Sequence, residues 1–358
     1  MNKVSPEKPQ FLSGVVEGFY GKPWSWALRR RYAHYLSELG LNTYLYCPKS
    51  DGYLRRNWSQ PWPTEIFRQL GDVANSCRQA GINFGVGLSP YALYQHYGNK
   101  QQDCLRAKLT ELSRLQPAIL AVLFDDMPGD HQQLADIQGR IITDIRRWCD
   151  IPRIIMCPTY YSFDPVLERH FGDRPKRYWS CLGAALPEGV DILWTGNRVC
   201  SESIYADDIR GISEALGRPV LLWDNYPVND GAERSKHLYL QPLSRRGPFE
   251  AGQVSGHLCN PMNQGCVSML PLLGLGALYG TLSPSNIERQ AEQLFGKPTA
   301  AALLRDRALF QQIGLGSMGE SQCQQLASEY AAFDTAAGAE VASWLRGEYQ
   351  FDPTCLTD

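Results

Sequence analysis

The chain has 358 residues, of which 44% are hydrophobic and 20% charged, and its formal net charge is −2. This composition predicts a globular protein with a large buried core and excludes a disordered chain. The near-neutral charge, without a long basic run, argues against nucleic-acid binding. No stretch approaches about 18 consecutive apolar residues, so no membrane-spanning helix is predicted.

The cysteines and histidines indicate a compartment and exclude some kinds of site. The eleven cysteines form no C-x-x-C pair, which favours reduced thiols in the cytoplasm over a disulfide framework or a zinc site. The six histidines form no H-x-H or H-E-x-x-H motif, so neither a metal nor a cofactor is predicted. Residues 1–13 lack the apolar core of a secretory signal.

Eight short runs rich in apolar, aromatic and β-branched residues predict strands. Most are continuously apolar, as expected for a parallel sheet that is covered on both faces. The runs are Leu12–Glu17, Thr43–Cys47, Asn83–Leu88, Ala121–Phe124, Arg153–Cys157, Asp191–Trp194, Val220–Trp223 and Ser255–Leu258. Segments with a helical period lie between most of them, at Trp26–Glu38, Pro63–Ala80, Cys104–Leu115, His131–Trp148 and Ser203–Leu216.

Eight strands that alternate with helices predict an α/β fold, a (β/α)8 TIM barrel over residues 11–282. An open doubly wound sheet is the alternative, but the turn "GVVEGFYG" lacks the G-x-G-x-x-G spacing of a dinucleotide site. After Ser283 the strand runs stop, and helical stretches follow at Ile287–Leu294, Thr299–Ile313 and Glu320–Trp344. We therefore predict a small C-terminal helical appendage over residues 283–358.

The carboxyl ends of the predicted strands carry polar and aromatic residues. Barrel enzymes place their chemistry at this end of the strands. The strand ends include Gly18, Lys49, Asp125-Asp126, Tyr160-Tyr161, Trp194, Trp223, Asn225 and Asn260. Carboxylates and amides bind sugar hydroxyls, and flat rings stack on the C–H face of a sugar, so this rim predicts a carbohydrate site.

The stretch "AVLFDDMPGD" ends an apolar run on two adjacent carboxylates, Asp125 and Asp126. Two carboxylates in a partly dry cleft titrate together, and the pKa of one is expected to rise. That division suits acid catalysis of glycoside hydrolysis. Neighbouring residues cannot easily flank a glycosidic bond from opposite faces, so the spacing favours a nucleophile from elsewhere, including the substrate itself. Two ligands of a Mg²⁺ ion remain the alternative.

At these residues the chain resembles glycoside hydrolase family 84, the O-GlcNAcase or hyaluronidase-like β-N-acetylglucosaminidases. The resemblance covers Phe11 to about Asn263 and keeps the order of the family's motifs. The matching stretches are "GVVEGFYGKPW", "LNTYLYCPKSD", "LFDDM", "CPTYY", "LWTG", "WDNYPVND" and "CNPMN".

The resemblance implies retaining hydrolysis in which the 2-acetamido group of the sugar attacks its own anomeric carbon to give an oxazoline. In this reading Asp125 orients the acetamido N–H, Asp126 is the acid and base, and Tyr161 positions the acetamido group. The implied substrate-binding residues are Gly18, Lys49, Trp223, Asn225, Asp230 and Asn260. The implied partner is a protein or glycan that carries β-linked N-acetylglucosamine (GlcNAc).

Three positions depart from the family's pattern: Ser50, Tyr91 and Gly231. They are expected to alter affinity or leaving-group preference rather than the reaction. Two other classes stay open, a catalytically silent GlcNAc-binding protein and a metal-dependent barrel hydrolase. The natural aglycone and the oligomeric state have no signal in the sequence.

Overall fold

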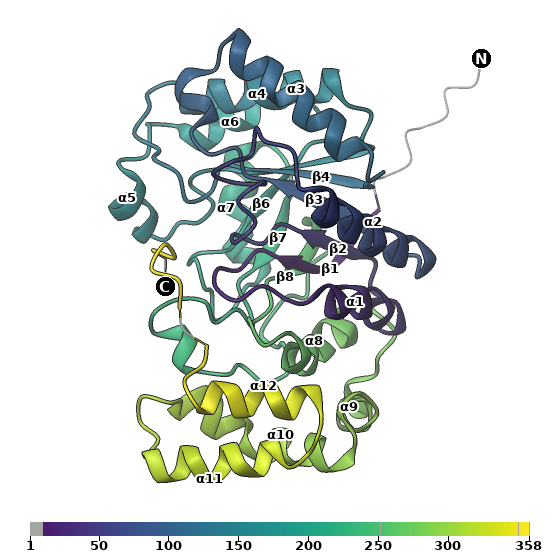
Figure 1. Cartoon of the computed structure of the whole chain (residues 1–358). Coiled ribbons are helices and arrows are strands. Elements are labelled where there is room, and N and C mark those ends of the chain that lie inside the picture. Colours follow the sequence, from purple (N-terminus) through teal and green to yellow (C-terminus); the bar gives the residue numbers. More distant parts are fainter. Residues whose placement is uncertain (1–9, 251, 350, 358) are drawn as a thin grey trace, which may run out of the picture.

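The computed structural model describes residues 10–250, 252–349 and 351–357. Eight parallel strands close into a barrel in which each strand pairs with the next and β8 pairs with β1 (Figure 1). The strands are β1 (Leu12–Glu17), β2 (Thr43–Tyr46), β3 (Asn83–Leu88), β4 (Ile119–Leu123), β5 (Arg153–Cys157), β6 (Asp191–Trp194), β7 (Val220–Asp224) and β8 (Val254–Cys259). All eight predicted strands are therefore confirmed, with ends that differ by at most two residues.

Helices follow the strands and cover the outside of the barrel (Figure 1). They are α1 (Trp26–Glu38), α2 (Thr64–Gln79), α3 (Asn99–Ser113), α4 (Leu134–Trp148), α5 (Val166–Phe171), α6 (Tyr178–Ala185), α7 (Ala206–Leu216) and α8 (Gly265–Tyr279). The helix predicted from Cys104 starts five residues earlier, at Asn99. Helices α5 and α6 were not predicted, because six and eight residues are too few to show a helical period.

Helix α8 was also not predicted, and its burial explains why. All residues from Gly265 to Gly276 are buried, between the barrel and the C-terminal helices, so the segment is apolar on every side. A helix that is hydrophobic all round has no polar face and therefore no amphipathic period.

The C-terminal helices lie together on one side of the barrel (Figure 1). They are α9 (Ile287–Phe295), α10 (Lys297–Ala308), α11 (Glu320–Ala331) and α12 (Ala336–Leu345), and a π-helical turn continues α10. The stretch predicted as one helix over Glu320–Trp344 is two, because Asp334 has a φ of +50° and Thr335 caps the N-terminus of α12. Whether residues 283–358 form a separate domain stays a prediction.

A buried carboxylate of α12 joins these helices to the barrel. Glu340 accepts hydrogen bonds from the N–H groups of Cys266 and Val267, at 3.1 and 2.9 Å, at the start of α8. Burial raises the pKa of Glu340 to about 7. Among the described residues no helix combines the length and the apolar character that a membrane crossing requires.

A buried ion pair lies where β1 ends. Arg29 of α1 forms an ion pair with Glu17 at 2.7 Å, and the hydroxyl of Tyr44 donates a hydrogen bond to the same carboxylate. The Arg29 guanidinium lies 4.4 Å from the ring centroid of Trp26 and 5.0 Å from that of Tyr46. Both charges are almost fully buried, so each compensates the desolvation of the other.

We predict that Arg29→Ala lowers the free energy of unfolding by about 3 kcal/mol, because it leaves the Glu17 carboxylate buried without its counter-charge. Urea unfolding followed by circular dichroism measures the change. Arg68→Ala, which removes a solvent-exposed ion pair of α2, is the control and should leave the midpoint unchanged. Equal effects of the two substitutions would show that the buried pair has no special role.

Candidate active site

One cavity opens among the carboxyl ends of the strands, where barrel enzymes place their chemistry. All nine predicted site residues line it: Gly18, Lys49, Asp125, Asp126, Tyr161, Trp223, Asn225, Asp230 and Asn260. The structure thus brings residues from β1, β2, β4, β5, β7 and β8 or the loops that follow them to one place.

The Lys49 ammonium lies between the two adjacent carboxylates. Its Nζ forms a very short ion pair with Asp125 Oδ2 and lies 3.6 Å from Asp126 Oδ2. Burial opposes the charge on Lys49, but the two aspartates outweigh it and raise the pKa of the ammonium. One buried cation therefore compensates two carboxylates.

The backbone of Asp126 explains how neighbouring residues reach the same cavity. Successive side chains of a strand point to opposite faces, but β4 ends at Leu123 and Asp126 has a φ of +54°, which is unusual for a residue with a side chain. The Asp126 carboxylate accepts hydrogen bonds from the hydroxyl of Tyr20 at 2.7 Å and from that of Tyr161 at 3.0 Å. Such a backbone conformation persists only when the surroundings fix it.

The pKa of Asp126 departs from the expectation that one carboxyl keeps its proton. Burial opposes ionisation, but Lys49, Arg55 and the hydrogen bonds from Tyr20 and Tyr161 outweigh it and lower the pKa of this carboxyl. The rise expected for one of the two aspartates is therefore not found at Asp126. The sequence reasoning counted the repulsion between the aspartates but not the surrounding cations and hydroxyls.

Asp125 presents an unused acceptor at the cavity. Its side chain is almost fully buried, and among the described residues its Oδ1 atom has no hydrogen-bond partner. A buried carboxylate oxygen without a partner is costly. Because Asp125 lines the cavity, an N–H group of a ligand is a suitable partner.

The opposite wall is a network of amides around an indole ring. Asn225 Oδ1 accepts hydrogen bonds from Trp223 Nε1 at 2.9 Å and from Asn260 Nδ2 at 3.0 Å, and Asn260 Oδ1 accepts from the N–H of Gly18 at 3.2 Å. A Cβ atom on Gly18 would lie 2.3 Å from Trp223, so a larger residue would displace the ring. The network fixes a flat aromatic surface beside polar groups.

Asp230 is a third carboxyl in the cavity, besides Asp125 and Asp126, and it is buried. Its Oδ2 accepts a hydrogen bond from the N–H of Tyr20 at 2.7 Å. Burial outweighs this and a second backbone hydrogen bond and raises the pKa of Asp230 to about 6. The group therefore titrates close to neutral pH.

Sequence reasoning missed Tyr20 and Arg55. Tyr20 lies within the quoted motif "GVVEGFYGKPW", directly after β1, so its position was a usable signal. Arg55 Nη2 donates to the carbonyl oxygen of Asp126 at 3.0 Å, and Nη1 donates to Ser89 Oγ at 3.0 Å. Nothing in the sequence of the loop after β2 distinguishes Arg55 from the adjacent Arg56.

The three departures from the family pattern do not line the cavity. Ser50 and Tyr91 are exposed, and Gly231 is buried next to Asp230. Tyr91 lies 5.5 Å below the Arg55 guanidinium, measured to the ring centroid. Whether these residues alter affinity or leaving-group preference stays a prediction.

Comparisons with known proteins agree on one family. A family profile described as β-N-acetylglucosaminidase matches residues 13–305. Protein O-GlcNAcase of Mus musculus and that of Rattus norvegicus are each 32% identical over 263 residues, which cover 70% of this chain and 28% of the relative. The chain therefore matches less than a third of the length of these relatives. A point mutant of the Thermobaculum terrenum O-GlcNAc hydrolase superposes with a TM-score of 0.77 at 28% identity, over 94% of this chain and 81% of the other.

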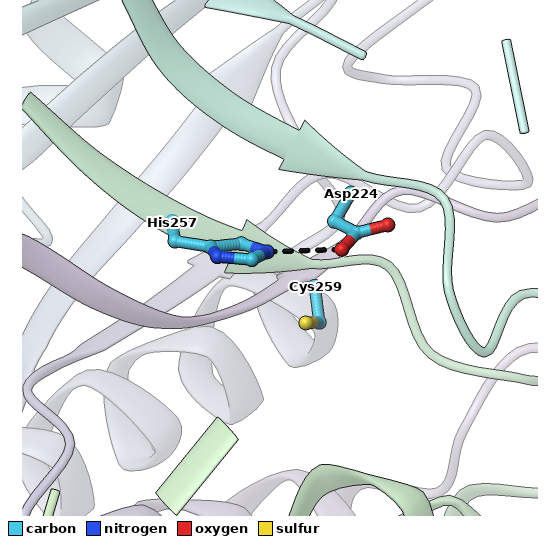
Figure 2. Close-up of side chains that lie close together, drawn as sticks. All are labelled: Asp224, His257 and Cys259. Atoms are coloured by element: carbon cyan, nitrogen blue, oxygen red, sulfur yellow. Dashed lines mark hydrogen bonds and ion pairs between the residues drawn. The ribbon is translucent and has the colours of Figure 1, made fainter. Parts of the chain in front are cut away.

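A separate cluster below the cavity has the composition of a metal site. Asp224, His257 and Cys259 lie at the ends of β7 and β8, and all three are buried (Figure 2). However, Asp224 forms an ion pair with Arg246 at 2.6 and 3.0 Å, and His257 Nε2 lies 3.0 Å from Asp224 Oδ2. A guanidinium on both carboxylate oxygens competes with a cation, so these residues fit a structural ion pair better than a metal centre.

We predict that Arg246→Ala lowers the free energy of unfolding by about 3 kcal/mol, because it leaves Asp224 as an uncompensated buried charge. Dialysis of the wild type against EDTA should leave its melting temperature unchanged. Differential scanning calorimetry with metal analysis by mass spectrometry checks both statements. A stoichiometric zinc ion whose removal lowers the melting temperature would instead identify a metal centre.

Proposed function

Because the chain belongs to the β-N-acetylglucosaminidase family, glycoside hydrolase family 84, we propose that it removes terminal β-linked GlcNAc from proteins or glycoconjugates with retention of configuration. The single observation that carries the mechanism is the Asp125 carboxylate, fixed by Lys49 and with one oxygen unpaired among the described residues. An acceptor of this kind suits the N–H of a 2-acetamido group. Its neighbour Asp126 suits the glycosidic oxygen.

In the first step the acetamido carbonyl oxygen attacks the anomeric carbon while the bond from that carbon to the leaving oxygen breaks. Asp126 gives its proton to the leaving oxygen, and Asp125 stabilises the positive charge that develops on the acetamido nitrogen. In the second step water attacks the anomeric carbon of the oxazoline, the bond from that carbon to the acetamido oxygen breaks and restores the acetamido group, and Asp126 takes a proton from the water. Two inversions give retention, and the intramolecular nucleophile has a high effective concentration.

This role requires the pKa of Asp126 to rise when the substrate binds. Lys49, Arg55 and the hydroxyls of Tyr20 and Tyr161 stabilise the ionised form of Asp126. A sugar ring that displaces water desolvates the carboxylate, which favours its protonated form. Tyr161, which contacts Asp126 at 3.0 Å, is then available to the acetamido group.

The remaining wall residues are proposed to bind the sugar. Asn225, Asp230 and Asn260 bind the hydroxyls and Trp223 forms the wall of the pocket, with Gly18 leaving room for the indole ring. Lys49 completes the pocket and keeps the two aspartates in place. Polar groups that converge beside an aromatic ring are the usual composition of a sugar site.

The aglycone and compartment are further parts of the proposal. The similar mammalian proteins are named Protein O-GlcNAcase, which favours glycosylated serine or threonine of proteins over free glycan fragments. All eleven cysteines are described and none forms a disulfide, which supports the reducing environment of the cytoplasm.

We predict that the wild type hydrolyses an aryl 2-acetamido-2-deoxy-β-glucoside and that Asp126→Asn lowers kcat/KM by about 10²- to 10⁴-fold, because the acid and base is lost. Asp125→Asn should lower kcat by at least about 10²-fold, because the developing charge loses its partner. Steady-state kinetics with and without EDTA measures both effects.

Asp130→Asn is the matched control for these variants, since Asp130 lies on the same loop, is exposed and does not line the cavity. Its activity should equal that of the wild type. An inactive wild type that still binds a thiazoline analogue of the oxazoline would identify a binding protein. Loss of activity with EDTA would identify a metal-dependent hydrolase.

We predict that affinity for the thiazoline falls about tenfold between pH 8 and pH 5, because Asp230, with a pKa of about 6, accepts sugar hydroxyls when ionised and loses that charge as pH falls. Isothermal titration calorimetry across this range measures the change. Asp230→Asn should bind more weakly at pH 8 and show little dependence on pH. An unchanged pH profile in this variant would assign the titration to another group.

A further inference from the structure

The last described residues of the chain reach the catalytic cavity. After α12 ends at Leu345, the chain leaves the helical region and runs back toward the barrel, as the yellow segment in Figure 1 shows. Cys355 and Thr357 line the same cavity as Asp126 and Tyr161. The Thr357 side chain interacts with the Tyr161 hydroxyl: burial raises the pKa of Tyr161, and Thr357 counteracts part of that rise.

The contact uses a catalytic hydroxyl. Tyr161 has one proton, which it donates to Asp126 Oδ1 at 3.0 Å, and Thr357 interacts with the same hydroxyl group. In the proposed reaction this hydroxyl is needed by the acetamido group. Thr357 and the substrate therefore compete for Tyr161.

Local hydrogen bonds shape the described part of the segment. The Asp352 side chain accepts hydrogen bonds from the N–H and hydroxyl of Thr354, at 2.9 and 2.7 Å, and its carbonyl accepts from the N–H of Cys355 at 2.9 Å. Phe351 and Leu356 are 41% and 48% exposed, so their side chains anchor little of the segment. A segment with so little buried apolar surface can leave the cavity without unfolding the barrel.

We propose that residues 352–357 are an intramolecular ligand of the catalytic cavity that the substrate displaces before it reacts. A threonine hydroxyl next to Tyr161 and Asp126 resembles the alcohol that hydrolysis of glycosylated threonine releases, so the segment acts like a bound product. This inference rests on the proposed function for its effect on turnover, but the docking itself does not. While the segment is docked, the cavity is closed to substrate. The apparent KM is therefore higher than that of the undocked protein, by a factor that depends on the fraction of molecules in which the segment is docked.

The first test measures docking without any substrate. The rate of alkylation of Cys355 by iodoacetamide, read by peptide mass spectrometry, reports how often the segment leaves the cavity, and exposed Cys181 is the internal reference. Thr357→Ala should raise the Cys355 rate about threefold to fivefold, the effect of one net hydrogen bond. Thr357→Ser keeps the hydroxyl and should behave like the wild type.

The second test adds the substrate site. Saturating thiazoline analogue should raise the Cys355 rate in the wild type, and Thr357→Ala should lower KM for the aryl glycoside by the same factor with kcat unchanged. If the thiazoline slows the alkylation of Cys355, or if Thr357→Ala raises KM, the segment helps to bind the sugar. Either result would overturn the proposal. Identical Cys355 rates in wild type and Thr357→Ala would show that the hydroxyl does not dock the segment.

The two proposals fail in different ways. If the wild type neither binds the thiazoline nor hydrolyses the glycoside, the proposed function is wrong. The comparison of Cys355 rates between wild type, Thr357→Ala and Thr357→Ser still decides whether the segment occupies the cavity.

Discussion

The Lys49 ammonium between Asp125 and Asp126 is the interaction on which the site depends. Two carboxylates on consecutive residues repel each other, and in a buried place that repulsion is not screened by water. Lys49, in the loop after β2, compensates both, and the left-handed backbone at Asp126 turns the second carboxylate toward the same cavity. Tyr20, Tyr161 and Arg55 then have a fixed anion to bind. Removing the cation would leave all these groups around uncompensated charge.

Much of this arrangement could be predicted from sequence for a simple reason. In a parallel barrel every strand is buried on both faces, so its residues form continuous apolar runs, and every carboxyl end lies at one rim. The residues that directly follow those runs are therefore predicted to lie together, and they include Lys49, the aspartate pair, Tyr161 and Asn260. The spacing of the aspartates also predicted a feature of the mechanism. Adjacent residues cannot easily place carboxylates on opposite sides of a glycosidic bond, which favours a nucleophile from elsewhere.

What could not be predicted depends on contacts between distant segments. Arg55 reaches the backbone of Asp126 across 71 positions, and no local pattern marks it. The lowered pKa of Asp126 arises from groups on three other segments, so the aspartate pair alone did not predict it. Helix α8 lacked a period because it is buried on all sides. Thr357 interacts with Tyr161, although the two residues are nearly two hundred positions apart in the sequence.

The C-terminal helices support the loop that follows β7 and carries Asn225 and Asp230. Trp344 Nε1 donates to the carbonyl of Ser235 at 3.0 Å, and the N–H of Leu315 donates to that of Lys236 at 2.8 Å. One end of the described chain, residue 10, lies at the amino edge of β1, whereas residue 357 lies in the cavity at the opposite edge. For anyone who expresses this protein, the two ends are therefore not equivalent attachment points. An affinity tag or fluorescent protein joined before residue 10 is separated from the catalytic cavity by the length of a strand, whereas one joined after residue 357 starts beside it.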